Sequence, residues 1–406
     1  MHTQATNMET QTTHTIQPAQ RLQSVQEYYF SRKLKEVARL NAEGRDIISL
    51  AIGSPDMPPS ERTIDVLCQE ARKATAHGYQ PTVGTPELRQ AMAAFYRRWY
   101  GVDLDPQCEL QPLIGSKEGI LHVTLALVNP GDKVLVPNPG YPTYTALSRL
   151  LGADVVTYDL TEATGWQPDF GQLECLVAEG GYKLLWTNYP HMPTGARAQR
   201  RTYERLVDFA RRHGIVVVND NPYSFILNDG ERLSILQVPG AKDCCIEFNS
   251  MSKSHNLPGW RVGMLATNAT FISWILKVKS NIDSGTFRAM QLAAAEALNG
   301  NSDEWHRQAN VATYASRRTI AEDIMRALHC TFDPTQTGMF LWGRIPDEVA
   351  NVEDLTERVL HEARVFIAPG FIFGSNGNRY IRISLCAKDE LMRQALQRIR
   401  EMSTKK

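Results

Sequence analysis

The sequence predicts an α/β protein in which a mostly parallel sheet is covered by helices on both faces and is joined to a smaller α+β domain. From Gly152 onward, short apolar segments alternate with helical stretches, which is typical of βαβ units. Polar side chains follow several of these apolar segments, at the strand ends where parallel sheets bind ligands. After about residue 298 the pattern changes to helices and short strands, which indicates a second domain.

Composition limits the possible functions. A chain of 406 residues with 43% hydrophobic content can bury one large core and a smaller one. Lys+Arg and Asp+Glu are equal at 44 each, so no net charge attracts nucleic acid or an anionic membrane. No apolar run approaches about 18 residues, and the N-terminus lacks a basic-then-apolar signal. The seven cysteines are scattered without a CxxC pair, which predicts reduced thiols in the cytoplasm, with no disulfide or metal site.

The ends of the chain differ from its centre. The first 20 residues are polar, rich in Thr and Gln, and without periodicity, which predicts a disordered tail. Apolar residues then recur at helical spacing over residues 22–40, which predicts an amphipathic helix. The predicted organisation is a tail (1–20), a segment joining the small domain (21–50), a large domain (51–298) and the rest of the small domain (299–406).

Two loops in the first half carry candidate binding residues. Residues 47–60 read as a strand running into a Gly/Pro loop that contains Gly53. Residues 113–119 lead from an apolar strand into a helix through a turn with Ser116 and Lys117. A glycine and a hydroxyl at a helix N-terminus leave N–H groups suited to phosphate, although many βα turns look the same. The next strand, near residue 135, ends in a loop with Tyr141, which is otherwise typical of the edge of a core.

The strands that follow end in polar residues. Residues 183–196 and 214–226 each contain an apolar strand, and their ends carry Asn188, Asp220 and Tyr223. Because the carboxyl ends of parallel strands meet at one edge of a sheet, we expect these side chains to lie close together. An aspartate that ends a strand is otherwise often the cap of the next helix.

The stretch from residue 250 to 264, SMSKSHNLPGWRVGM, is the most informative in the chain. It follows an apolar strand at 243–249, and it places Lys253 between two serines. Arg261 comes after a Pro-Gly turn, just before the strand 262–266. A surface loop with two solvated cations is the alternative. A lysine desolvated at a strand end would have its pKa lowered from about 10.4 toward the range of a base or nucleophile.

Together these motifs resemble the class I/II aminotransferases, which are pyridoxal-phosphate enzymes of fold type I. The phrases GSKEGI, PGYPTY and LPGWRVGM are most similar to the branch that holds LL-diaminopimelate, alanine and aspartate aminotransferases. The resemblance spans nearly the whole chain. It implies a large domain with a seven-stranded sheet, a homodimer, and a reaction on small-molecule amino acids and 2-oxo acids.

The resemblance also implies a role for each candidate residue. Lys253 would hold pyridoxal phosphate as an internal aldimine and act as the base at Cα of the substrate. Asp220 would pair with the pyridine nitrogen of the cofactor, and Tyr223 would form a hydrogen bond with its ring hydroxyl. The remaining cofactor-binding residues would be Ser116, Lys117, Ser250 and Arg261 near the phosphate, Tyr141 on the ring face, and Tyr79 from the neighbouring subunit; the substrate-binding residues would be Gly53 and Arg382, with Arg382 on the α-carboxylate. Lys117 also falls where some similar enzymes bind a distal carboxylate.

The implied reaction is a ping-pong transfer of an amino group between an L-amino acid and a 2-oxo acid. Two alternatives stay open: a fold-type I lyase or cyclase with the same lysine, and a non-catalytic regulator that binds the cofactor. Regulators of this kind carry a helix-turn-helix domain, for which the N-terminal tail is too short. The sequence leaves the amino donor and the acceptor open.

One position departs from the family pattern. The family's NPTG asparagine, which donates to the ring oxygen of the cofactor, corresponds here to Met192, whose thioether cannot donate a hydrogen bond. Tyr223 would then be the main partner of that oxygen, with Asn188 as a possible substitute. Arg382, a charge within an apolar strand, must be paired or must face a cleft, and a structural salt bridge is the alternative to carboxylate binding.

Overall fold

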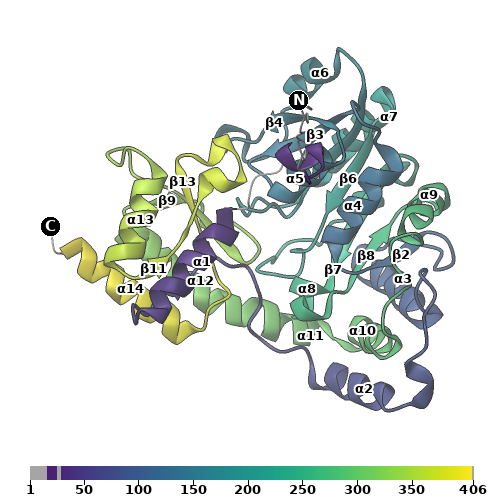
Figure 1. Ribbon diagram of the computed structural model, residues 1–406, viewed down its shortest axis with the longest axis horizontal. Helices are drawn as coiled ribbons and strands as arrows, with labels where there is room; N and C mark the ends of the chain where they lie inside the picture. Colours follow the sequence, from purple (N-terminus) through teal and green to yellow (C-terminus); the bar gives the residue numbers. More distant parts are fainter. Residues whose placement is uncertain (1–15, 25–28, 405–406) are drawn as a thin grey trace, which may run out of the picture.

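Two parts, each with a sheet and helices, lie side by side in the molecule (Figure 1). The structure is a computed structural model that describes residues 16–24 and 29–404. The predicted disordered tail falls mostly outside these residues. The larger part holds a seven-stranded sheet, and the smaller part holds the helix Tyr29–Ala42 together with about the last quarter of the chain (Figure 1).

The seven-stranded sheet is mostly parallel. Its order is β2-β8-β7-β6-β5-β3-β4, and β8 alone of these seven runs antiparallel to both of its neighbours. The strands are β2 (Leu110–Leu113), β3 (Lys133–Asn138), β4 (Asp154–Asp159), β5 (Tyr182–Thr187), β6 (Val216–Asp220), β7 (Cys245–Ser250) and β8 (Gly263–Ala266). The predicted fold class is therefore confirmed.

Helices cover both faces of this sheet. Val217 and Val218 are neighbours on β6, and they belong to two different buried clusters, since successive side chains of a strand point to opposite faces. Both clusters are apolar, which explains why these strands read as continuous apolar runs. The helices of this part are α2 (Glu61–Ala71), α3 (Pro86–Tyr100), α4 (Ser116–Leu127), α5 (Pro142–Leu150), α6 (Phe170–Val177), α7 (Arg200–His213), α8 (Met251–Ser254), α9 (Ala269–Lys279) and α10 (Arg288–Gly300).

The smaller part is built around a four-stranded antiparallel sheet. Its order is β12-β13-β10-β9, with β9 (Thr331–Phe332), β10 (Phe340–Arg344), β12 (Ala368–Pro369) and β13 (Tyr380–Ser384). The helices around it are α1 (Tyr29–Ala42), α12 (Thr313–Ala327), α13 (Val352–Glu362) and α14 (Asp389–Thr404), whereas α11 (Asp303–His306) packs against the larger part, where the His306 ring lies 4.6 Å from that of Phe225. The apolar stretch at residues 365–369 forms two short strands, because β11 (Val365–Phe366) leaves this sheet to pair with β1 (Ile48–Ser49). This pairing ties residues 48 and 49 to the smaller part, whereas the 3-10 helix Gln20–Ser24, which belongs to the same predicted segment (21–50), lies against α5 of the larger part.

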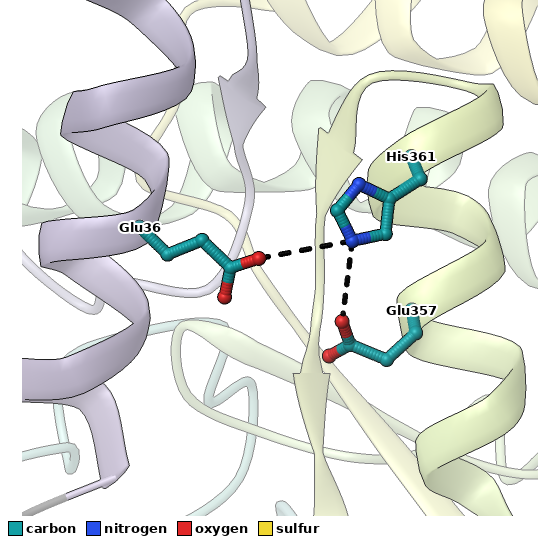
Figure 2. Close-up of side chains that lie close together, drawn as sticks. All are labelled: Glu36, Glu357 and His361. Carbon is teal, nitrogen blue, oxygen red and sulfur yellow. Dashed lines mark ion pairs between the residues drawn. The ribbon is translucent and has the colours of Figure 1, made fainter.

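Ion pairs join α1 to α13. Lys33 Nζ lies 2.5 Å from Glu357 Oε1 and 2.8 Å from Glu36 Oε2. His361 Nε2 lies 3.7 Å from Glu36 Oε1 and 3.5 Å from Glu357 Oε2 (Figure 2). The ammonium of Lys33 thus balances two carboxylates at this junction. Residues 25–28, within the predicted helix at 22–40, lie outside the described residues, and the described helix begins at Tyr29.

The seven-stranded sheet carries a buried carboxyl group, that of Glu247 on β7. The Glu247 side chain is fully buried and accepts hydrogen bonds from Ser234 Oγ (2.7 Å), Asn219 Nδ2 (2.9 Å) and the Ile235 N–H (3.1 Å). Burial raises the pKa of Glu247 from 4.5 to about 7, although these hydrogen bonds lower it. The folded protein therefore holds this proton more tightly than the unfolded chain, and the carboxyl costs stability as pH rises from about 4.5 to 7.

We expect Glu247→Gln to stabilise the protein at pH 8 by up to about 3 kcal/mol and to be near neutral at pH 5. The amide keeps the shape of the carboxyl and removes its buried charge. Urea unfolding of both proteins at the two pH values measures this difference. Glu179→Gln, at a side chain that is 82% exposed, is the control and should show no such pH dependence. An equal effect of Glu247→Gln at pH 5 and pH 8 would contradict the titration.

Candidate active site

Ten of the eleven predicted site residues line one cavity of about 510 Å³ between the two parts of the molecule. They come from loops and strand ends that are far apart in the chain. The ten are Gly53, Ser116, Lys117, Tyr141, Asp220, Tyr223, Ser250, Lys253, Arg261 and Arg382. Tyr79 is the exception: it is 94% exposed and does not line this cavity.

Lys253 lies in the short helix α8, directly after β7. The Ser250 side chain caps this helix and accepts a hydrogen bond from the Ser252 N–H at 3.2 Å. The amine of Lys253 donates to the backbone carbonyl of Gly53 on the other side of the cavity. Burial lowers the pKa of Lys253, and the nearby cations of Arg382 and Arg261 lower it further. A larger fraction of this lysine is therefore neutral and able to act as a nucleophile or base.

Asp220 ends β6 and is 6% exposed. Its Oδ2 accepts a hydrogen bond from the Tyr144 hydroxyl at 2.9 Å, and its Oδ1 has no partner among the described residues. Burial raises the pKa of Asp220 from 3.8 to about 6, and the bond from Tyr144 offsets part of that rise. A buried carboxylate oxygen without a donor is costly, so this position suits a cationic or N–H-bearing group of a ligand.

The start of α4 lies beside the Arg261 side chain, an arrangement that suits an anion. The free N–H groups at the N-terminus of this helix lie beside Arg261, whose Nη1 is 3.5 Å from Ser252 Oγ and whose Nη2 is 3.5 Å from the Ile114 carbonyl. The Ser116 hydroxyl is buried and has no partner among the described residues. A Cβ atom at Gly115 would lie 2.1 Å from Arg261 Nη2, so only glycine admits the guanidinium here. These groups fit the phosphate of the predicted cofactor.

A buried charge cluster holds this turn from behind. Glu118 accepts from the Ile114 N–H at 2.6 Å, from Lys279 Nζ at 2.6 Å and pairs with His122 Nε2 at 2.6 Å. Burial alone would raise the pKa of Glu118, but its bonds to His122 and Lys279 lower it to about 2. Lys279 Nζ also lies 2.6 Å from Asp283 Oδ2, so an internal ammonium balances both carboxylates. The cluster fixes the backbone at Ile114, directly before the turn of Gly115 and Ser116 that starts α4.

Arg382 lies in the middle of β13 and is 4% exposed. Its Nη2 donates to the Ala51 carbonyl at 2.8 Å, and its Nη1 lies 3.2 Å from Met192 Sδ. The rings of Phe340 and Phe373 lie 3.9 and 4.5 Å from its guanidinium carbon, which is cation–π geometry. Arg382 also lines the cavity, so its planar guanidinium is placed where a ligand carboxylate could accept two hydrogen bonds from it.

The turn after β5 shows what Met192 and Asn188 do. Asn188 Nδ2 donates to the Asp220 carbonyl at 2.5 Å, and its Oδ1 accepts from the Met192 N–H at 2.9 Å. Both bonds go to backbone, so Asn188 holds the turn to β6 in place. Tyr223 packs edge-on against Phe340 at 5.9 Å, and burial raises the pKa of its hydroxyl. Tyr223 therefore stays a hydrogen-bond donor over the whole physiological pH range.

Several site residues are not evident from the sequence. Tyr144, three residues after Tyr141 in PGYPTY, is the partner of Asp220, and its helical spacing from Tyr141 was the available signal. Ser252 contributes a second hydroxyl beside Arg261, and no pattern distinguishes it from Ser250 and Ser254. The apolar wall of Phe30, Phe340 and Phe373 comes from three distant segments. No local sequence pattern brings these three rings together.

No helix among the described residues is long and apolar enough to span a membrane. The cavity lies at the carboxyl ends of β6 and β7, the position at which parallel sheets bind ligands.

Comparisons with known proteins agree with the geometry. The family model for aminotransferase class I and II matches residues 45–399. The chain is 41% identical to the LL-diaminopimelate aminotransferase of Moorella thermoacetica, over 95% of this chain and 98% of that protein. It is 38% identical to the enzyme of the same name from Dehalococcoides mccartyi, over 94% of this chain and 97% of that protein.

Solved structures give the same result. BacF from Bacillus subtilis superposes with a TM-score of 0.91 at 32% identity, over 96% of this chain and 99% of that one. A probable N-succinyldiaminopimelate aminotransferase from Thermus thermophilus superposes with a TM-score of 0.84 at 33% identity, over 92% and 99%. The predicted activity and cofactor are confirmed, and nothing favours the lyase, cyclase or regulator. The chain belongs to the class I and II aminotransferases, enzymes that use pyridoxal phosphate to move an amino group between small amino and 2-oxo acids.

Proposed function

We propose that this aminotransferase takes its amino group from an amino acid with a distal carboxylate, of the LL-diaminopimelate or dicarboxylic type. The observation that carries the proposal is the set of cations around one cavity. Lys253 is the amine, Arg261 lies at the helix N-terminus, and Arg382 lies on the facing wall. Lys117 is a fourth cation at the same cavity and has no ion-pair partner among the described residues. The relatives that carry the LL-diaminopimelate name support this choice.

The chain's own groups would act as follows. Pyridoxal phosphate supplies an aldehyde for the amine and a ring that accepts electrons from Cα of the substrate. Arg261, the Ser116 turn and Ser250 would hold the phosphate, and the ionised Asp220 would keep the ring nitrogen protonated. Arg382 would fork onto the α-carboxylate and thereby direct the Cα–H bond toward Lys253. The Lys253 amine, whose pKa is lowered, would take the proton from Cα of the substrate. It would then donate that proton to the carbon of the cofactor that carries the transferred nitrogen.

We expect Lys117→Ala to raise KM for aspartate, glutamate and LL-diaminopimelate by about tenfold or more, and to leave KM for alanine within about twofold. The substitution removes a cation that only substrates with a distal carboxylate can use. Initial rates with a panel of amino donors, at saturating 2-oxo acid, measure this difference. Lys277→Ala, at an exposed lysine on α9, is the matched control. An equal loss for alanine and aspartate would remove the distal-carboxylate assignment.

We also propose a homodimer in the cytoplasm, with Tyr79 completing the phosphate site of the partner subunit. Tyr79 is 94% exposed, and the nearby Ile282 and Phe287 are 51% and 41% exposed. Phe287 stacks on His77 at 5.8 Å, so apolar surface extends next to Tyr79. Exposed aromatic and aliphatic groups of this kind are typical of an interface.

Mixed dimers test this arrangement. We expect Tyr79→Ala and Lys253→Ala subunits to recover activity when they are refolded or co-expressed together at equal amounts, up to about a quarter of the wild-type value. Half of the randomly formed dimers then hold one site with an intact Lys253 and an intact Tyr79 from its partner. Activity is assayed at limiting cofactor, and sedimentation reports the mass of the particle. A monomer, or mixtures no more active than the separate variants, would refute the shared site.

A further inference from the structure

A second cavity of about 350 Å³ lies where β9, β10 and β13 of the smaller part face the loops after β4 and β5. Its volume is in the range of small-molecule sites. Thr194 and Gly195 line it, whereas Met192 of the same turn lines the active-site cavity. Among the described residues none lines both cavities. We refer to it as the junction cavity.

One wall of the junction cavity is aromatic. Trp342 and Tyr380 stack with ring centroids 5.0 Å apart and an interplanar angle of 7°. Trp166 meets Tyr380 edge-on at 5.2 Å. The ring of Phe332 lines the same space. This wall offers flat and edge surfaces on which a further ring can pack, a geometry that stabilises aromatic pairs beyond the area they bury.

Two cations and two acids also line the junction cavity. The guanidiniums are those of Arg197 and Arg344, which are 39% and 42% exposed. Arg197 Nη1 pairs with Asp229 at 2.5 Å and Arg344 Nη2 pairs with Asp347 at 2.9 Å. These two partner acids lie outside the cavity lining and are 82% and 79% exposed. Such exposed pairs contribute little to stability, so either guanidinium can turn to a ligand carboxylate at small cost.

The acids of this cavity are Glu162 and Asp333. Glu162 Oε2 accepts from the Tyr380 hydroxyl at 3.0 Å, and Asp333 Oδ1 accepts from the Thr335 backbone N–H at 2.7 Å. With two positive and two negative side chains, the lining has no net charge. Both arginines are also paired with acids outside the lining, Asp229 and Asp347, so a phosphate or a dicarboxylate would meet no excess of positive charge. A zwitterion can satisfy both signs at once, with its carboxylate on an arginine and its ammonium on an acid.

We propose that the junction cavity is a second small-molecule site, which binds a free aromatic amino acid such as phenylalanine or tryptophan. The ring would pack on the wall of Trp166 and Tyr380. The carboxylate would meet Arg344 or Arg197, and the ammonium would meet Asp333 or Glu162. The site is separate from the substrate cavity, and it does not depend on which amino donor the enzyme uses.

Calorimetric titration of L-phenylalanine tests this site on the holoenzyme after borohydride reduction, which prevents the added amino acid from reacting with the cofactor in the active site. We expect saturable binding at one site per chain. Two analogues that each lack one charge, 3-phenylpropionate and phenethylamine, should bind at least about tenfold more weakly. These comparisons use the unaltered chain, so folding does not affect them. The absence of saturable binding at phenylalanine concentrations up to about 10 mM would overturn the proposal, because any weaker binding has a negligible free energy.

Variants then locate the site. We expect Trp166→Ala and Arg344→Ala each to weaken phenylalanine binding by about tenfold or more. Matched controls outside both cavities, Trp274→Ala and Arg200→Ala, should leave it unchanged; these side chains are 42% and 48% exposed. Arg382→Ala, which disables carboxylate binding in the active site, should also leave it unchanged. Binding that survives the first two substitutions, or that is lost in Arg382→Ala, would show that the ligand sits elsewhere. Circular dichroism of each variant confirms that it is folded.

Discussion

Lys253→Ala is expected to lower kcat by at least about 10⁴-fold, the upper end of what a positioned general base contributes. The cavity is lined by Lys253 together with Asp220, Arg261 and Arg382, and burial together with the two neighbouring guanidiniums lowers the pKa of the Lys253 amine. Lys117, the other lysine at this cavity, lies at the start of α4 and is exposed, so it does not replace Lys253. Single-turnover kinetics with pre-bound cofactor measure the loss.

Two further proteins make the result specific to the amine. Lys253→Arg keeps a cation in the site but does not lose its proton near neutral pH, so it should be as inactive as the alanine variant. Lys277→Ala, at an exposed lysine on α9, should be as active as the wild type. If Lys253→Ala retained more than about a hundredth of kcat, the assignment of the base would be wrong.

Asp220→Asn is expected to lower kcat by about 10³-fold. Opposite charges about 4 Å apart at an effective dielectric of about 20 interact by roughly 4 kcal/mol, which corresponds to about three pKa units of the ring nitrogen. The amide keeps the size of the side chain and a hydrogen bond to Tyr144, and it removes only the charge. The substitution should therefore lower kcat more than it lowers the affinity for the cofactor. Absorbance titration with the cofactor measures that affinity.

A cofactor analogue methylated at the ring nitrogen separates charge from structure. Its nitrogen carries a permanent positive charge, so it should restore much of the activity of Asp220→Asn and add nothing to the wild type. Asp154→Asn, at an exposed position that begins β4, is the control for loss of a carboxylate. A variant that stayed slow with the methylated analogue would mean that Asp220 acts through packing.

The sequence was sufficient for the fold and for most of the cavity, because each signal was local. Apolar runs ended at Asp220 and Ser250, and the sheet topology then brought those ends together. Glycine and serine at the start of α4 indicated the anion site for the same reason. The lowered pKa expected for Lys253 follows from its position at a strand end, and the structure gives the same direction with burial as the first cause.

The features of the site that could not be predicted from the sequence depend on contacts between distant segments. The aromatic setting of Arg382 needs Phe340 and Phe373, which approach it only after β10 and β13 pair. The bond from Tyr144 to Asp220 joins residues 76 positions apart. The contact between Met192 and Arg382 spans 190 positions and gives the departure from the family asparagine a physical partner. Tyr79 stays a prediction, because its role needs a second subunit.

Borohydride reduction of the holoenzyme, followed by protease digestion and mass spectrometry, tests the central assignment most directly. Reduction should bleach the visible absorbance of the protein and leave a single pyridoxyl-phosphate mass on the peptide that contains Lys253, in a stoichiometry of one per chain. A protein that takes up no cofactor, or that carries the label on Lys117 or another lysine, would contradict the account.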